Sequence, residues 1–162
     1  MILKLFPIIA ITSALNAAVF PILPNLNVTP GAVDPNVGVE QLCVWGYTGT
    51  VRNVSPAKKK HVYELYSVDP NKDKYEVDHL ISLELGGTND IKNLWPQSYT
   101  TEPWNARVKD KLENRLHREM CDGIITVEEA QDLVAHDWID SYCALYDDKQ
   151  KECQKYKKNK EK

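Results

Sequence analysis

The sequence lacks any Cys-x-x-Cys pair, although its 162 residues include four cysteines. Zinc ribbons and zinc knuckles bind their metal through such closely spaced pairs, so the spacing argues against both kinds of site. Phenylalanine is also scarce, with two present against four tryptophans and eight tyrosines. Tryptophan and tyrosine must therefore supply most of the aromatic packing. No internal repeat is visible, and the length suits one compact domain.

The chain also lacks an apolar run of the roughly 20 residues that a membrane-spanning helix needs. Its most apolar stretch, residues 5–15, follows the positive charge of Lys4 and precedes small residues at Ala17 and Ala18. This layout is typical of a secretory signal peptide. We therefore expect residues 1–18 to be removed and the mature protein to be secreted, without stable membrane association. An uncleaved membrane anchor is the alternative.

Secretion decides how the four cysteines are interpreted. Outside the cytosol, two disulfides are the default. Four cysteines allow three pairings. We favour Cys43–Cys121, which would tie the N-terminal part to a helix end, and Cys143–Cys153, which would close a short loop near the C-terminus.

A positive net charge is absent as well. The chain carries −3, whereas nucleic-acid-binding domains are usually basic. Net charge says little about a local patch, however, and two basic clusters are present at residues 58–61 and 149–162. Each cluster has a plainer interpretation, as a solvated face or a frayed terminus.

Proline and glycine divide the chain into segments. Residues 19–38 are rich in both, which predicts an extended N-terminal arm or pro-segment. A folded domain is expected over residues 39–147, followed by a basic C-terminal tail at residues 148–162.

Inside the expected domain, local patterns predict the first elements. Residues 42–51 alternate loosely between apolar and polar and contain two glycines, which indicates a strand and a turn. Ser55 followed by Pro56 is a helix start, because serine caps the first turn and proline suits the first helical position. That helix could run to about Tyr66.

The second half of the domain combines two short strands with two helices. Tyr75 and Val77 predict a strand that leads into Asp78-His79, and residues 93–95 predict a second strand after a Gly-Gly loop. A helix follows Pro103 and ends before Gly123. Its apolar stripe recurs every four residues, at Trp104, Val108, Leu112, Leu116 and Met120.

A further helix is expected to start at a capping box formed by Thr126 and Glu129. Its inward residues would be Ala130, Leu133, Val134, Trp138 and Tyr142. The fold class is therefore α+β, with a two-stranded ribbon packed on a helix. Because such a ribbon cannot stand alone, additional helices and two disulfides must complete the core.

Four pieces of sequence occur in a distinctive order. They are Asp78-His79, Gly86-Gly87, Asn93-Leu94 and, on the following helix, Asn105. In this order they resemble the HNH endonuclease family, also called the ββα-metal or His-Me finger nucleases. The resemblance covers Tyr75 to about Trp138 and implies a small ββα-metal core. It also implies hydrolysis of phosphodiester bonds in DNA, or in RNA, with little sequence specificity.

The resemblance assigns a role to each motif residue. His79 would be the general base, since a neutral imidazole can accept a proton near pH 7. Asp78 and Asn105 would hold Mg²⁺ or another divalent cation such as Mn²⁺, because hard cations prefer oxygen ligands. Asn93 would brace the loop between the strands and orient the histidine, with Asn89 as a weaker candidate for that role. Neighbouring residues on a strand face opposite ways, so Asp78 and His79 share a site only if the strand ends or kinks there.

Three basic residues are candidates for contacts with the phosphates of the substrate: Arg52, Arg107 and Lys109. They can equally be ordinary surface charges. Asn105 could be a simple helix-start residue and Asn93 an ordinary turn residue.

The partner implied by the resemblance is a nucleic-acid substrate, and a monomer is expected. The main alternative is a non-catalytic secreted module, on a nuclease-like scaffold, that binds nucleic acid or a protein. A secreted effector that acts on a protein partner is a third reading.

Overall fold

The structure is a computed structural model that describes residues 23–69, 71 and 74–161. The predicted signal peptide at residues 1–18 lies outside this part of the chain. The fold mixes helices with one ribbon of two antiparallel strands, β1 (Tyr75–His79) and β2 (Leu94–Ser98). The helices are α1 (Val39–Leu42), α2 (Tyr47–Val51), α3 (Pro56–Leu65), α4 (Ala106–Cys121), α5 (Val127–Ala135), α6 (Trp138–Leu145) and α7 (Gln150–Lys160). Two short 3₁₀ turns, η1 (Leu83–Leu85) and η2 (Ile91–Asn93), lie between the strands.

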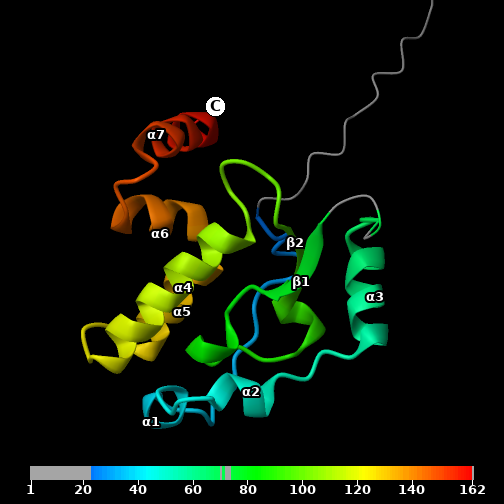
Figure 1. The fold of residues 1–162 in the computed structure, drawn as a ribbon, viewed down its shortest axis with the longest axis vertical. Coiled ribbons are helices and arrows are strands. Elements are labelled where there is room, and N and C mark those ends of the chain that lie inside the picture. Colours follow the sequence, from blue (N-terminus) through cyan, green and yellow to red (C-terminus); the bar gives the residue numbers. More distant parts are fainter. Residues whose placement is uncertain (1–22, 70, 72–73, 162) are drawn as a thin grey trace, which may run out of the picture.

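The ribbon lies between α3 on one side and α4 on the other (Figure 1). Asp78 pairs with Trp95 across the ribbon, and His79 pairs with Leu94. Because side chains alternate along a strand, Asp78 and His79 leave β1 from opposite faces. Helices cover the faces of this small ribbon, which supplies the burial that two strands alone lack.

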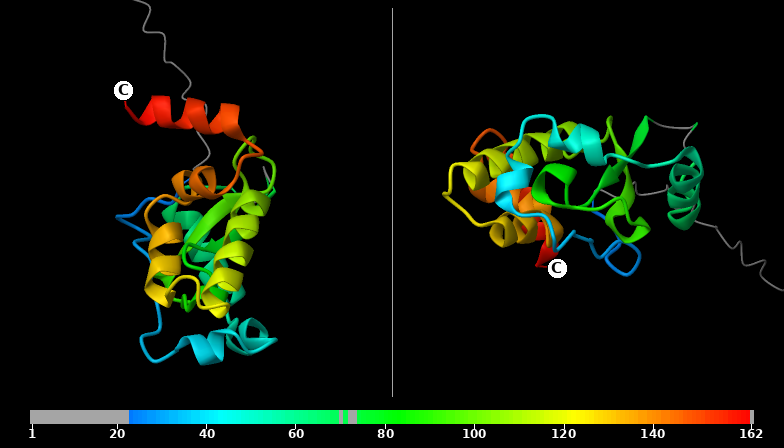
Figure 2. Two further views of the ribbon diagram at one scale, coloured as in Figure 1. Left: turned by 90° about the vertical axis from the view of Figure 1, so that its left-hand side faces the viewer. Right: turned by 90° about the horizontal axis from the view of Figure 1, so that it is seen from below.

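The core is largely helical and aromatic. Trp104 meets Trp138 and Tyr142 edge-on, at centroid distances of 6.2 and 5.9 Å. Leu112 and Leu116 of α4 are fully buried, as the apolar stripe predicts. Figure 2 shows α4 and α5 side by side, with α7 across the end of the molecule at which α4 begins.

The predicted helix starts and stops of α3 and α4 are confirmed. Ser55 caps α3 by accepting from the Lys58 amide at 3.2 Å. Gly123 follows the end of α4 with a φ of 71°, a conformation that favours glycine.

The predicted single helix after Thr126 is wrong in one respect. Its capping box with Glu129 is present, but the chain breaks at residues 136–137 into α5 and α6. Asp137 causes the second start, because its side chain accepts from the amides of Ile139 and Asp140. The apolar stripe continues across the break, with Val134 and Trp138 both buried.

The strand and turn predicted for residues 42–51 are also wrong, because this segment contains the last residue of α1, a turn and the whole of α2. No neighbouring strand offers a partner within the described residues, and the ribbon contains only β1 and β2. Gly46 has a φ of 83° and precedes α2, so the turn belongs between two helices. The Cys43 disulfide at the end of α1 fixes the segment against α4.

Both favoured disulfides are confirmed. Cys43–Cys121 joins α1 to the end of α4 across 78 residues, and Cys143–Cys153 joins α6 to α7 across 10 residues. Residues 150–160 of the predicted tail therefore form a helix attached to the body, which excludes the frayed terminus for this stretch. Tyr156 adds to the attachment by meeting Trp104 edge-on at 6.2 Å.

The described part of the N-terminal arm, residues 23–38, lies against the body of the protein. The Gly31 amide donates to the Lys92 carbonyl at 2.9 Å, and the Thr29 hydroxyl donates to the Leu94 carbonyl at 2.9 Å. Val33 forms an isolated bridge with Gly87. None of the helices among the described residues has the length and apolarity needed to cross a membrane.

Candidate functional site

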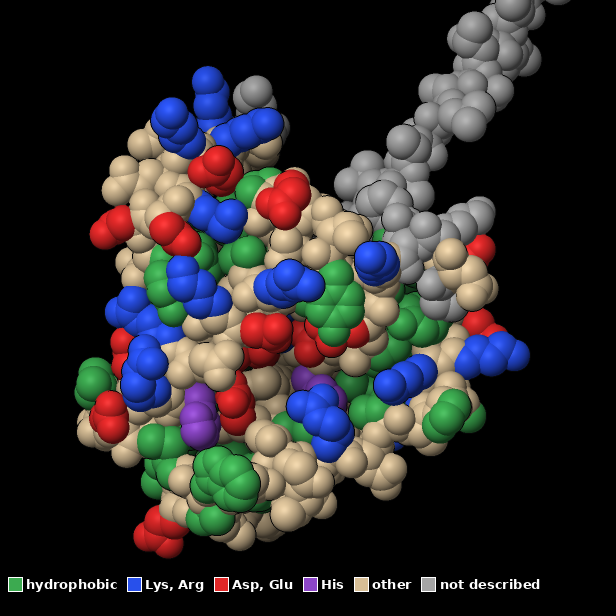
Figure 3. Space-filling model, in the orientation of Figure 1, with side chains coloured by type: hydrophobic (Ala, Val, Ile, Leu, Met, Phe, Trp, Pro, Cys, Tyr) green, Lys and Arg blue, Asp and Glu red, His purple; other side chains and the backbone are tan. Residues whose placement is uncertain are grey.

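A polar hollow of about 250 Å³ opens between α2, β1 and α4. Six of the side chains that line it carry the chemistry discussed below: Arg52, Asp78, His79, Glu84, Asp110 and Asn114. Figure 3 shows acidic side chains gathered in the middle of this face, beside a histidine and between α4 and the ribbon. The sequence motif Asp78-His79 thus lies at an open, negatively charged cleft.

His79 is the last residue of β1, so the strand ends where a shared site requires it to end. Its side chain and that of Asp78 both line the hollow although they leave the strand from opposite faces. Immediately after it, the Leu80 amide donates to the Asn93 carbonyl at 2.7 Å as the chain turns away.

The tautomer of His79 follows from its neighbour Asn89. The Asn89 Nδ2 donates to the Val51 carbonyl at 2.8 Å, and its Oδ1 accepts from the Asn53 amide at 3.3 Å. These backbone contacts fix the orientation of the Asn89 amide group. Its Oδ1 lies 3.1 Å from the His79 Nε2, which must therefore carry the proton and donate it. The lone pair of the neutral ring is then on Nδ1.

Burial lowers the pKa of His79, and the charges of Arg52 and Lys109 act in the same direction. The hydrogen bond that His79 donates to Asn89 and the charge of Asp78 oppose this effect without reversing it. The ring is therefore neutral at pH 7, and its Nδ1 can accept a proton.

Lys109 is not at the surface, so the predicted contact with substrate phosphates is wrong. Its side chain is completely buried and reaches from α4 into the base of the hollow. Its Nζ donates to the Asp78 Oδ2 at 2.8 Å, to the His79 carbonyl at 2.7 Å and to the Glu113 carboxylate. These three acceptors use all three ammonium protons. Burial alone would lower the pKa of Lys109, but the charges of Asp78 and Glu113 outweigh it and raise that pKa.

Two further acidic side chains repel one another across the hollow. Burial raises the pKa of Glu84, and the charge of Asp110 adds to the increase while His117 opposes it. Burial also raises the pKa of Asp110, with the charge of Asp78 adding to it. A cation among these oxygens would relieve this repulsion.

Asn93 holds the loop between the strands in place. Its Oδ1 accepts from the Ile81 amide at 3.0 Å, and its Nδ2 donates to the Ile81 and Thr88 carbonyls at 2.9 Å. Glycine is required beside it, since a Cβ on Gly87 would lie 1.8 Å from the Ile81 carbonyl oxygen. The hydrogen bond to His79 comes from Asn89 instead, so the predicted orienting role of Asn93 belongs to Asn89.

Asn105 does not line the hollow, so the structure does not bring this predicted metal ligand together with Asp78. It is the N-cap of α4, where its Oδ1 accepts from the Val108 amide at 3.3 Å. Its Nδ2 donates to the Thr101 carbonyl at 3.1 Å. The oxygen that a cation would need is therefore committed to the helix start.

Two other residues, both farther along α4 than Asn105, line the hollow where a ligand from this helix was expected. Asp110 and Asn114 are exposed, lie one turn apart and line the hollow. The Asn114 Nδ2 donates to the Asp110 carbonyl at 2.7 Å, so its Oδ1 is the amide atom that a cation could use. Sequence reasoning missed both, although their spacing of four on the polar side of the stripe was a usable signal.

The two predicted arginines differ in position. Arg52 directly follows α2 and lines the hollow. Arg107 is exposed and lies three residues before Asp110 on α4, outside the lining. Their contacts with phosphate stay predictions.

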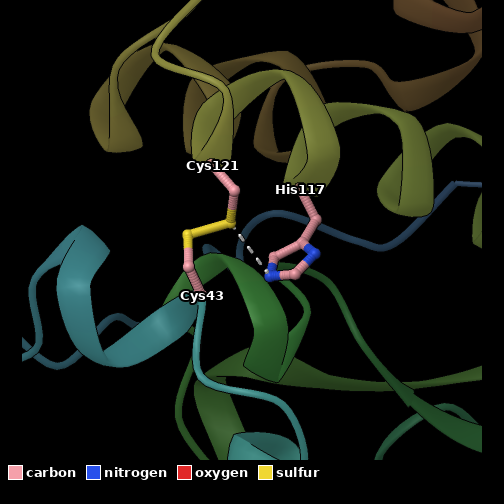
Figure 4. A group of neighbouring side chains, drawn as sticks. All are labelled: Cys43, His117 and Cys121. Atoms are coloured by element: carbon pink, nitrogen blue, oxygen red, sulfur yellow. Dashed lines mark hydrogen bonds between the residues drawn. A yellow bond between two sulfur atoms is a disulfide. The ribbon is translucent and has the colours of Figure 1, made fainter.

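A separate group of side chains, Cys43, His117 and Cys121, has ligand atoms within 4.8 Å of one another (Figure 4). Its sulfurs are bonded to each other, and the His117 Nε2 lies 3.1 Å from the Leu42 carbonyl oxygen, so it offers no metal site. Among the described residues it is the one set of three His, Cys, Asp or Glu ligand atoms this close. No three of the described carboxylates that line the polar hollow therefore have oxygens this close together, which means that they are spread around its wall.

Comparisons with models of protein families, with curated proteins and with solved structures gave no significant match to this chain. The resemblance to the HNH family therefore rests on the motif residues of the sequence alone.

Proposed function

We propose that the protein is a secreted, metal-dependent endonuclease whose ββα-metal core consists of β1, β2 and α4. The observation that carries this proposal is the fixed tautomer of His79, whose Nδ1 is left as a base among the carboxylates of an open hollow. A neutral base in the same hollow as several carboxylates suits hydrolysis of a phosphodiester.

His79 takes the proton from the attacking water through Nδ1. Asn89 holds the ring by its opposite nitrogen, and the charge of Asp78 favours the imidazolium that results. Lys109 fixes Asp78 through Oδ2 and fixes the end of β1 through the His79 carbonyl. Water attacks directly, so no covalent intermediate with the protein forms.

The lining of the hollow suits a hard divalent cation such as Mg²⁺ or Mn²⁺. Asp78, Asp110 and the amide oxygen of Asn114 are the candidate ligands, and all offer oxygen atoms. Because the carboxylates are spread around the wall, the cation would keep several waters, as Mg²⁺ usually does. When bound, such a cation stabilises the negative charge on the phosphate and on the departing oxygen.

The substrate is DNA or RNA, cut with little sequence preference. The hollow is open and small, which suits a phosphate group better than the edges of a base pair. Two disulfides support a role outside the cytosol. The protein acts as a monomer in this proposal.

The test is cleavage of plasmid DNA and of structured RNA, with Mg²⁺ or Mn²⁺ and with a chelator. We expect cleavage that stops with the chelator and falls about 10²- to 10⁴-fold in His79→Ala, the usual contribution of a general base. His136→Ala, at an exposed histidine outside the hollow, is the matched control and should cut normally. Absence of cutting of either substrate with any divalent cation would refute the proposal.

A non-catalytic nucleic-acid-binding module is the second candidate, favoured by the acidic net charge of −3. A hollow lined by carboxylates repels phosphate unless a cation is present, which argues for the enzyme. Affinity for nucleic acid that is unaffected by chelator and by Asp78→Ala would favour the module.

A further inference from the structure

The charge of the chain is strongly divided between its C-terminal segment and the rest. Residues 149–162 contain seven lysines and two glutamates, a net charge of +5. The total is −3, so residues 1–148 carry −8. Figure 3 shows Lys and Arg side chains gathered at the end of the molecule formed by α7, away from the acidic centre of the same face.

This basic segment is held rigidly on the body of the protein. The Cys143–Cys153 disulfide attaches one side of α7 to α6. The Tyr156 hydroxyl donates to the Asp137 carboxylate at 2.9 Å, and the Lys160 Nζ donates to the same carboxylate at 2.7 Å. The lysines of α7 therefore present a fixed pattern of charge.

A hollow of about 570 Å³ separates α7 from the segment that leads into α4. Its lining carries three lysines, Lys149, Lys151 and Lys155, against two glutamates, Glu102 and Glu152, and it includes Trp104. Lys151 and Lys155 are exposed, lie one helical turn apart and have no ion-pair partner among the described residues. They are free to meet the phosphates of a ligand.

We call this hollow the groove beside α7. It lies close to the polar hollow that contains Asp78 and His79. α4 begins at Ala106, two residues after Trp104 of the groove, and reaches Asp110 about 6 Å and Asn114 about 12 Å along its axis. Arg107, in the first turn of α4, is exposed and lies in sequence between Trp104 of the groove and Asp110 of the polar hollow. Phosphates follow one another about every 3.4 Å along each strand of a duplex, so a few nucleotides span this interval.

We propose that the groove beside α7 binds the phosphate backbone of the nucleic-acid substrate, a few nucleotides from the bond that is cut. The proposal rests on the proposed function for the nature of the substrate. It explains how a chain of negative net charge holds a polyanion, because the acidic hollow takes a cation with the scissile phosphate while the lysines take the flanking phosphates.

The test measures binding in chelator, where no cleavage occurs. Anisotropy of a labelled 20-base-pair duplex is titrated at several salt concentrations with the wild type and with K151Q/K155Q. Each lysine–phosphate contact contributes about 0.9 to the slope of log affinity against log salt. We expect the double variant to lower that slope by about 2 and to weaken binding about tenfold or more at low salt.

The matched control is K92Q/R118Q, which removes two exposed charges outside the groove and should keep the wild-type slope. A wild-type slope in K151Q/K155Q would overturn the proposal. So would a variant that loses binding to phosphatidylserine vesicles but keeps its affinity for the duplex, since the partner would then be a membrane surface.

Hydrolysis of bis(p-nitrophenyl) phosphate separates this proposal from the proposed function. That small diester reaches the acidic hollow without the groove, so K151Q/K155Q should hydrolyse it normally. A wild type that hydrolyses no diester but binds the duplex through these lysines would refute the nuclease and leave the groove assignment intact.

Discussion

A single buried ammonium joins the candidate base, a candidate metal ligand and the core. Lys109 is completely buried and satisfies Asp78, Glu113 and the end of β1 at once. Desolvating three charged groups is costly, and the arrangement is stable because each charge has a partner. Removing the Lys109 ammonium therefore tests how much this cluster contributes to stability.

Lys109→Met should strongly destabilise the protein. The substitution leaves the buried Glu113 and the partly buried Asp78 without their cation, and breaking a buried ion pair by removing one partner costs about 3–5 kcal/mol. Urea denaturation followed by circular dichroism measures the loss. Lys111→Met on the same helix is the control, because its ion pair with Asp148 is about half exposed and should contribute far less. Equal losses in the two variants would contradict the buried-cluster interpretation.

Several features of the site could be predicted at the residue scale. Asp78 and His79 are distinctive in sequence because their type and order match a nuclease motif, and they do share a hollow. The burial of Lys109 could not be predicted, since lysine is rarely buried and two of its three acceptors come from a distant strand. The contact of Asn89 with His79 depends on loop geometry that the sequence does not display.

At the scale of elements, α4 supplies both a helix start and one wall of the hollow. Asn105 at its start and Asn114 farther along have the same side chain, but their amide groups make different contacts. The Asn105 Oδ1 caps the helix, whereas the Asn114 amide bonds the Asp110 carbonyl through its Nδ2. Position along the helix therefore decides which asparagine can serve a cation.

Asn114→Ala and Asn105→Ala should have separate effects. Asn114→Ala should raise the Mg²⁺ concentration needed for half-maximal cleavage with little change in stability, because it removes a candidate ligand. Asn105→Ala should lower the free energy of unfolding by about 1 kcal/mol, the usual contribution of an N-cap, and leave the Mg²⁺ dependence unchanged. Magnesium titration of cleavage and urea denaturation check the two outcomes. The reverse pattern would restore Asn105 as the ligand.

The elements that local chemistry defines were predictable, and those defined by tertiary contacts were not. α3 and α4 carry their own caps, stripe or stop signals, and β1 has alternating residues. The helical state of residues 42–51 depends on a disulfide to α4 and on a left-handed Gly46. The local alternation of apolar and polar residues therefore predicted a strand wrongly. The break before α6 depends on Asp137, whose capping contacts override a continuous apolar stripe.

At the scale of the whole molecule, the two disulfides stabilise different parts of the fold. Cys43–Cys121 closes most of the domain and holds α1 against the far end of α4. Cys143–Cys153 closes a short loop and holds α7 on α6. The first therefore acts chiefly on global stability, and the second on the position of the lysine-rich helix.

Removing each disulfide by serine substitution should separate these two roles. Constraint of the unfolded chain grows with loop length, so the entropic contribution is about 4.5 kcal/mol for a separation of 78 residues and about 2.7 kcal/mol for 10. C43S/C121S should lower the free energy of unfolding more than C143S/C153S, as measured by urea denaturation. C143S/C153S should weaken duplex binding, because α7 loses its disulfide to α6. Hydrolysis of a small diester should continue, because this disulfide does not contact the polar hollow that contains His79. A larger destabilisation from C143S/C153S than from C43S/C121S would contradict the loop-length argument. Unchanged duplex binding in C143S/C153S would show that the side-chain contacts of Tyr156 with Asp137 and Trp104 suffice to hold α7.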